Sequence, residues 1–188
     1  MAFPVLSTLG RKIFGTRNER MVKRYLRIVE QVSAQEDEIN KLTDPQLRAK
    51  TDEFRDRIKA GEKPVDLIPE VFAVAREAMD RAVGIRNIFN PNEKFDPSKL
   101  PPAAVRLYDE VRQQIEKTPA RDASGHLLGN TAPIQSWQFV DIPPELYAAV
   151  RVLYPQSKPP FRARPFDVQI IGAMVLHSLG EAAKQMTG

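Results

Sequence analysis

The stretch that decides the fold is LIPEVFAVAREAMDRAVGIR, residues 67–86. Its apolar side chains recur at the three- and four-residue spacing of one face of an α-helix. The positions on this face are Ile68, Val71, Phe72, Ala75, Ala78, Met79 and Ala82. The pattern predicts a helix that begins at Pro69, where a missing N–H costs little, and ends at Gly84.

The same spacing predicts three helices upstream of this stretch. The first is short and basic, within residues 3–13, and the second begins at about Asn18. The third begins at Thr43-Asp44-Pro45, where a side-chain oxygen can cap the first amides, and stops at Gly61. The first 86 residues therefore predict four amphipathic helices.

The composition changes between residues 87 and 163, which hold 11 of the 16 prolines. Helical patterns begin at Pro101-Pro102 and at Pro143-Pro144, and between them Trp137 and Phe139 alternate with polar residues as in a short strand. A disordered linker rarely carries a tryptophan and two helix-length apolar stripes. We interpret this segment as an inserted subdomain with a small aromatic core.

A strongly apolar helix is predicted after Arg164, over Val168 to Leu176, with a break at Gly180. No apolar run reaches the roughly 18–20 residues that span a bilayer. The N-terminus does not read as a secretory signal, and the chain has no cysteine. The two histidines, His126 and His177, lie far apart, so we expect no metal site.

Three stretches, found in order, resemble SecA, the preprotein translocase ATPase family. They are IFGTRNER (residues 13–20), residues 42–86 with LTD, KTDEFR and LIPEVFAVAREA, and RPFDVQIIGAMVLH (residues 164–177). In the family the third stretch follows closely on the motif that Gly84-Ile85-Arg86 matches. The resemblance therefore marks residues 87–163 as an insertion.

The resemblance implies that Gln169 reads the adenine of ATP, with Phe166 similar to the apolar residue beside the base. A primary amide offers a donor and an acceptor side by side, which complements the N6/N7 edge of adenine. Spacing alone leaves a simpler alternative, in which Gln169 only caps or hydrates the start of a helix.

Thr187-Gly188 resembles the start of the family's Thr-Gly-Glu-Gly-Lys-Thr phosphate loop. In such loops backbone amides hold phosphate, the lysine reaches the terminal phosphates and the last hydroxyl holds magnesium. This chain has only the first two residues. We therefore expect a share of a Mg-ATP site, no catalytic residue, and no ATP hydrolysis by this chain alone.

Positive charge is concentrated in residues 1–27, where seven cations stand against Glu19, although the whole chain has a net charge of only +4. The resemblance implies that this basic segment contacts anionic lipids and the SecYEG channel. The pattern alone fits equally well a solvated helix face packed on its domain. Aromatic residues are nearly absent among the basic ones, so we do not expect nucleic-acid binding.

The resemblance implies a motor segment that is cytoplasmic and peripheral on the inner membrane. Its full-length form would couple ATP hydrolysis to export of preproteins through SecYEG and form a homo-oligomer. The alternative is a truncated, non-catalytic SecA-like module that binds membrane or translocon.

For the fold we expect a mostly α-helical chain, the N-terminal helical portion of a P-loop, RecA-like α/β motor domain of the helicase type. Its expected parts are the motor-domain helices (residues 1–86), the Pro-rich insertion (87–163) and the adenine-recognition helix leading into the phosphate loop (164–188).

Overall fold

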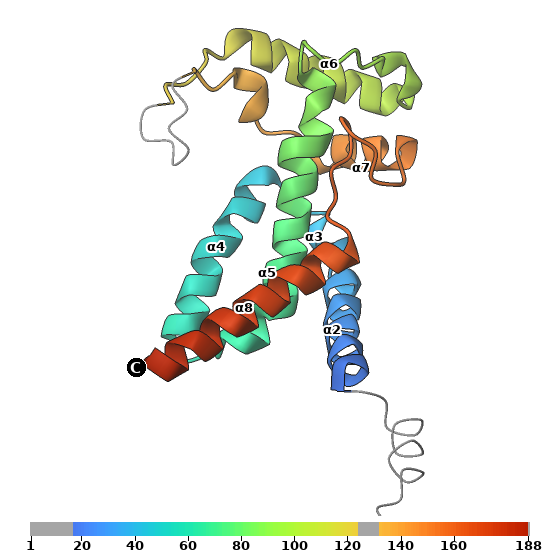
Figure 1. Cartoon of the computed structure of the whole chain (residues 1–188). Helices are drawn as coiled ribbons and strands as arrows, with labels where there is room; N and C mark the ends of the chain where they lie inside the picture. Colours follow the sequence, from blue (N-terminus) through green and yellow to red (C-terminus); the bar gives the residue numbers. More distant parts are fainter. Residues whose placement is uncertain (1–16, 124–131, 188) are drawn as a thin grey trace, which may run out of the picture. The chain divides into compact units, whose positions relative to one another are not determined.

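The computed structural model describes residues 17–123 and 132–187, and this part of the chain is mostly α-helical, as predicted (Figure 1). The α-helices are α2 (Arg17–Ala34), α3 (Glu36–Ile39), α4 (Asp44–Lys59), α5 (Pro64–Met79), α6 (Pro102–Lys117), α7 (Pro144–Leu153) and α8 (Asp167–Thr187). The described residues form no β-strand, only an isolated antiparallel bridge between Arg121 and Ile134. The short helix predicted within residues 3–13 lies outside the described residues.

The chain divides into two compact units. One contains the residues up to 34 together with those from 166 onward, and the other contains residues 35–165. The sequence-based division at residues 86/87 and 163/164 stays a prediction.

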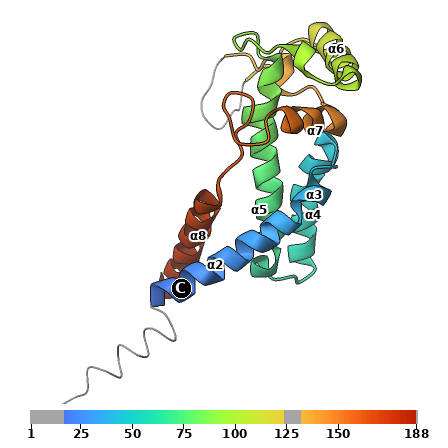
Figure 2. The ribbon, with the colours of Figure 1, turned by 90° about the vertical axis from the view of Figure 1, so that its right-hand side faces the viewer.

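The first unit is built from α2 and α8, which contact each other (Figure 2). Val29 and Val32 of α2 are buried, and so are Ile170 and Met174 of α8. The Tyr25 hydroxyl donates to Ser178 Oγ at 3.5 Å. α8 continues through Gly180 to Thr187, so the break predicted at Gly180 is wrong. A single glycine costs a helix only about 1 kcal/mol, which an otherwise favourable sequence tolerates.

The second unit begins with α3, α4 and α5. The predicted start of α4 is confirmed: Thr43 Oγ1 accepts from the Gln46 amide at 3.4 Å, and Gln46 Oε1 accepts from the Thr43 amide at 2.8 Å. This reciprocal capping box satisfies two amides that no helical carbonyl can reach. α4 ends before Gly61, which adopts a left-handed φ of +100°.

α5 begins at Pro64, five residues before the predicted start at Pro69. Pro64 occupies the first turn, where the absent N–H has no helical partner to lose, and Pro69 is accommodated inside the helix. α4 and α5 contact each other, and charged side chains join them. Lys50 and Arg57 of α4 both pair with Glu70 of α5, at 2.9 Å and 2.6 Å.

α5 ends at Met79, before the predicted end at Gly84, and the winding changes there. Asp80–Gly84 form a π-helical turn and Ile85–Phe89 a 3₁₀-helix. A Cβ at Gly84 would lie 2.5 Å from the backbone nitrogen of Ala163, so only glycine lets the chain approach this closely. The Asn87 side-chain amide donates to the Pro160 carbonyl at 2.8 Å. The end of the Pro-rich segment therefore lies next to its beginning.

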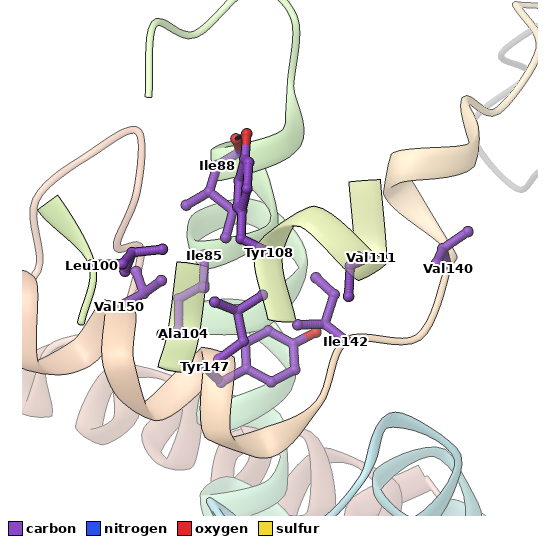
Figure 3. Close-up of a cluster of buried hydrophobic side chains, with 11 residues drawn as sticks. Ile85, Ile88, Leu100, Ala104, Tyr108, Val111, Val140, Ile142, Tyr147 and Val150 are labelled. Carbon is purple, nitrogen blue, oxygen red and sulfur yellow. Dashed lines mark hydrogen bonds between the residues drawn. The ribbon is translucent and has the colours of Figure 1, made fainter. Parts of the chain in front are cut away.

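The core of the second unit lies between the 3₁₀-helix, α6 and α7 (Figure 3). Its fully buried members include Ile85, Ile142, Leu146, Tyr147 and Val150. Aromatic rings continue it outward: Phe89 stacks on Tyr108 with centroids 4.7 Å apart, and Phe161 meets both Phe95 and Tyr154. Because Ile85 belongs to this core, the Pro-rich segment shares its packing with the stretch that precedes it.

The strand predicted around Trp137 and Phe139 is wrong. Ser136–Gln138 form a 3₁₀-helix instead. Gln138 Oε1 accepts from the Gln135 amide at 3.0 Å, and the Gln138 amide donates to the Gln135 carbonyl at 2.9 Å. These bonds close the backbone into a turn that alternating apolar residues do not reveal.

Candidate functional site

The predicted adenine-reading residue lies in the first turn of α8. Gln169 is exposed, and its Oε1 accepts from the Phe166 backbone amide at 2.8 Å. The Phe166 carbonyl in turn accepts from the Gln169 amide at 2.9 Å. The two residues are thus brought together, and the Phe166 side chain is 62% exposed beside the amide. This is the geometry of a helix cap, the simpler role that spacing alone left open for Gln169.

Thr187, the other predicted site residue that the structure describes, lies elsewhere on α8. Thr187 is the last residue of α8, and Gly188 lies outside the described residues. At a rise of 1.5 Å per residue, Thr187 is about 27 Å along the helix from Gln169. Phe166 and Gln169 therefore lie far from Thr187 along α8, and the adenine site stays a prediction.

A buried ionic cluster, which sequence reasoning missed, is centred on Asp44 in the second unit. The Asp44 carboxylate accepts from Arg81 Nη1 at 3.0 Å, from Arg86 Nη2 at 2.5 Å and from the Ile142 amide at 3.1 Å. The Tyr147 hydroxyl donates to both of its oxygens, at 3.1 Å and 3.0 Å. Asp44 thereby holds α4, the two turns that follow α5 and the Pro-rich segment together.

Burial governs the electrostatics of this cluster. It raises the pKa of Tyr147 far above the ordinary value, so the hydroxyl remains a protonated donor at neutral pH. Burial alone would lower the pKa of Arg81, but the neighbouring Glu77 and Asp44 raise it. The Arg81 guanidinium also lies over the Tyr147 ring, 4.4 Å from its centroid.

The cluster continues through two more buried carboxylates. Glu77 accepts from Arg81 and, at 2.6 Å, from Arg151 of α7. Asp80 accepts from Arg162 Nε at 3.0 Å and from the Ala163 amide at 3.1 Å. Arg162 is fixed further by its Nη1 bond to the Tyr154 carbonyl at 2.5 Å. Each of these bonds is between a charged group and a fixed partner, the strongest kind in proteins.

A cavity of about 390 Å³ opens beside this cluster. Its charged lining consists of Arg76, Arg151, Arg162 and Arg164 with Glu36, Glu77 and Asp80. Glu36 pairs with Arg76 at 2.6 Å and with Arg164 at 2.5 Å. Among the described residues, no group of three or more histidines and carboxylates could hold a metal ion.

One signal in the sequence could have revealed the cluster. Arg76, Glu77, Asp80 and Arg81 interrupt the apolar pattern of residues 67–86 with opposite charges at four-residue spacing. Charged residues on a helix ordinarily form its solvated face. Charges inside a helix that is apolar on most sides instead indicate a buried, paired set.

Comparison with known proteins bears on residues 10–90, which contribute Asp44, Glu77, Asp80, Arg81 and Arg86 to this cluster. Residues 10–90 match a family model described as the SecA DEAD-like domain. The chain is also 52% identical over 83 residues to the protein translocase subunit SecA of Dechloromonas aromatica. Residues 10–90, which we call the SecA segment, are therefore similar to SecA.

The SecA match extends to other relatives. The protein translocase subunits SecA of Burkholderia vietnamiensis and Burkholderia ambifaria are 57% and 55% identical over 76 residues, which is 40% of this chain. The chain spans only 8–9% of the length of these relatives. No solved structure matched the chain.

The match confirms the predicted resemblance over residues 13–20 and 42–86, which lie inside the SecA segment. The stretch RPFDVQIIGAMVLH lies beyond it, so its likeness to SecA stays a prediction. Within the part of the chain that the structure describes, no helix is both long and apolar enough to cross a membrane.

Proposed function

We propose that this chain is the N-terminal segment of an ATP-driven motor that moves preproteins through the SecYEG channel. The observation that carries the proposal is the SecA match over residues 10–90, with 52–57% identity to proteins named as translocase subunits. The motor would work in the cytoplasm and on the inner face of the membrane, as a homo-oligomer in full-length form. No observation favours the non-catalytic module.

The proposed role of α8 is adenine recognition within a P-loop, RecA-like α/β domain. Gln169 Oε1 has two lone pairs and spends one on the Phe166 amide, so it can still accept from the adenine N6 amino group. Its NH₂ group can donate to N7 at the same time. The cap would thus hold the amide in the orientation that the base requires, with the exposed Phe166 ring beside it.

Mg-ATP would extend from this adenine site toward a phosphate loop that begins at Thr187-Gly188. The about 27 Å of helix between Gln169 and Thr187 is longer than one nucleotide can bridge. Binding of both ends therefore requires the last turns of α8 to leave the helical conformation. The poor packing of Val168 and Leu176, which are 71% and 72% exposed, fits a helix whose full set of partners lies elsewhere.

The proposed lipid contact uses the outer face of α2. Met21, Val22 and Leu26 are 43–49% exposed, and they alternate with exposed Arg20, Lys23, Arg24 and Arg27. A helix with apolar and cationic side chains exposed together suits the interface of an anionic bilayer. Each cation near such a surface contributes about 1 kcal/mol.

A translocation assay tests the proposal. The full-length protein that contains this chain is incubated with a radiolabelled preprotein and vesicles containing SecYEG, and protease protection of the preprotein is measured with and without ATP. We expect protection that requires hydrolysable ATP. Binding to the vesicles without ATP-dependent protection would instead establish the non-catalytic module.

A further inference from the structure

The cavity beside the buried cluster has a preorganised lining that suits an anionic ligand. It lies among α3, α5, α7 and the segment that follows α7, entirely within the second unit. Gln169 and Phe166 are not among its lining residues, so it is separate from the proposed adenine site. Its volume of about 390 Å³ falls in the range of small-molecule pockets.

The cluster behind the cavity carries more positive than negative charge. The four guanidinium groups are those of Arg81, Arg86, Arg151 and Arg162, and among the described residues they share three carboxylates, Asp44, Glu77 and Asp80. The Arg162 side chain is 5% exposed and that of Arg151 is 16% exposed. A buried charge without a full partner is costly, so an anion beside it is favoured.

The carboxylates that line the cavity do not oppose an anion strongly, because each already has two cationic partners. Glu77 is shared by Arg81 and Arg151, and Asp80 by Arg162 and Arg151. Glu36 is shared by Arg76 and Arg164. The arginines that line the cavity therefore carry its excess positive charge.

Arg164 is the arginine best placed to meet a ligand from solution. Its side chain is 37% exposed, and both of its hydrogen bonds to Glu36 use Nη2. Nη1 and Nε of the same guanidinium lie outside that pair. A planar guanidinium fork matches two oxygens of a phosphate or carboxylate at once.

We propose that this cavity, the arginine pocket, binds a small organic oxyanion, either a phosphate monoester or a carboxylate. Arg151 and Arg162 supply the fixed positive charge, and Arg164 closes on the oxygens from the rim. The apolar lining, Ile39, Ala73, Val152 and Pro155, accommodates the organic part of the ligand. The pocket joins the SecA segment to the Pro-rich segment, so the ligand would bind where the two meet.

NMR on the 188-residue chain tests the pocket with inorganic phosphate and with acetate as separate probes. The Nε–Hε signals of Arg151, Arg162 and Arg164 are followed at constant ionic strength, with sodium chloride as compensating salt. We expect saturable shifts with one of the two probes, and the probe that saturates identifies the oxyanion as tetrahedral or planar. Linear shifts of equal size at the exposed Arg48 would show general screening only and overturn the proposal.

Matched variants separate binding from a structural effect. Arg164→Gln should weaken binding of the saturating probe about tenfold, and Arg164→Lys should restore part of it by keeping the charge. Arg48→Gln removes an exposed arginine from the Asp141 pair, away from the pocket, and should leave binding unchanged. Unchanged binding in Arg164→Gln, with the fold intact, contradicts the assignment. This result is independent of whether Gln169 recognises adenine.

Discussion

The Tyr147 hydroxyl donates to the Asp44 carboxylate across 103 positions of sequence, at 3.0 Å and 3.1 Å to its two oxygens. This bond joins the first residue of α4 to the middle of α7, and so connects the SecA segment with the Pro-rich segment. Both residues are almost fully buried, at 4% and 0% exposure. A polar contact between two buried residues therefore attaches the Pro-rich segment to the SecA segment.

Replacing Asp44 tests this attachment. Asp44→Asn keeps the size of the side chain but leaves Arg81 and Arg86 without their shared charge. Breaking a buried ion pair from one side costs about 3–5 kcal/mol, so the free energy of unfolding should fall by about this amount. Urea denaturation monitored by circular dichroism measures it.

The control for Asp44 is Asp141→Asn. This change breaks the Asp141–Arg48 pair, whose side chains are 50% and 59% exposed. Exposed pairs contribute about 0–1 kcal/mol, so little change is expected. Equal effects of the two substitutions would show that the cluster is no more important than a surface pair.

Tyr147 should make the protein sensitive to alkali. Burial raises the pKa of Tyr147 above its unfolded value near 10. The folded state then holds this proton where the unfolded state has lost it, so its contribution to stability is complete below pH 10 and falls as the pH rises beyond that value. Tyr147→Phe should be less stable than the wild type at pH 7, and its free energy of unfolding should decline less steeply above pH 10. Identical slopes in the two proteins would argue against a buried, protonated Tyr147.

Gly84 allows the close return of the chain at Ala163. In Gly84→Ala the new Cβ would overlap the Ala163 backbone nitrogen at 2.5 Å, so backbone must shift. We expect a loss of about 1–3 kcal/mol, the usual cost of overpacking. Gly172→Ala is the matched control: its Cβ meets nothing within 4 Å, and alanine in a helix should stabilise by about 0.5–1 kcal/mol. A neutral result at Gly84 would contradict the close approach.

The basic face of α2 gives a test of the lipid contact. The double substitution Lys23→Gln and Arg24→Gln removes two exposed cations. At about 1 kcal/mol each, it should weaken binding to anionic phospholipid vesicles about thirtyfold in a sedimentation assay. The exposed pair Arg106→Gln and Arg112→Gln on α6 makes the same change in net charge. If the two double substitutions weaken binding equally, the effect comes from the overall charge of the protein and not from α2.

The sequence predicted the elements whose signals are local. The capping box at Thr43, the stop at Gly61 and the proline starts of α6 and α7 depend on neighbouring residues only, and the structure confirms them. The start of α5 was predicted at Pro69 because a proline suits the first helical turn and a clear apolar stripe surrounds this one. The first turn from Pro64 carries little of that stripe.

What could not be predicted depends on contacts between distant residues. Asp44 reads as an ordinary residue of a helix start, and nothing near it indicates that Arg86, Ile142 and Tyr147 converge on its carboxylate. The role of Gln169 could not be predicted from the sequence either. Its helical position follows from spacing, but spacing cannot distinguish a cap from a base-reading amide that is also a cap.

The most direct test of the account measures nucleotide affinity in a version of the protein that extends through a complete phosphate loop. Gln169→Glu keeps the oxygen that accepts from the Phe166 amide but removes the NH₂ group that would donate to adenine N7. Fluorescent ATP and GTP analogues are titrated against the wild type, Gln169→Glu and Gln169→Ala, with thermal unfolding as a check on the helix cap. We predict that Gln169→Glu folds as well as the wild type yet loses at least tenfold in ATP affinity and its preference for ATP over GTP. Unchanged ATP affinity in both variants would contradict the adenine assignment and leave Gln169 as a cap alone.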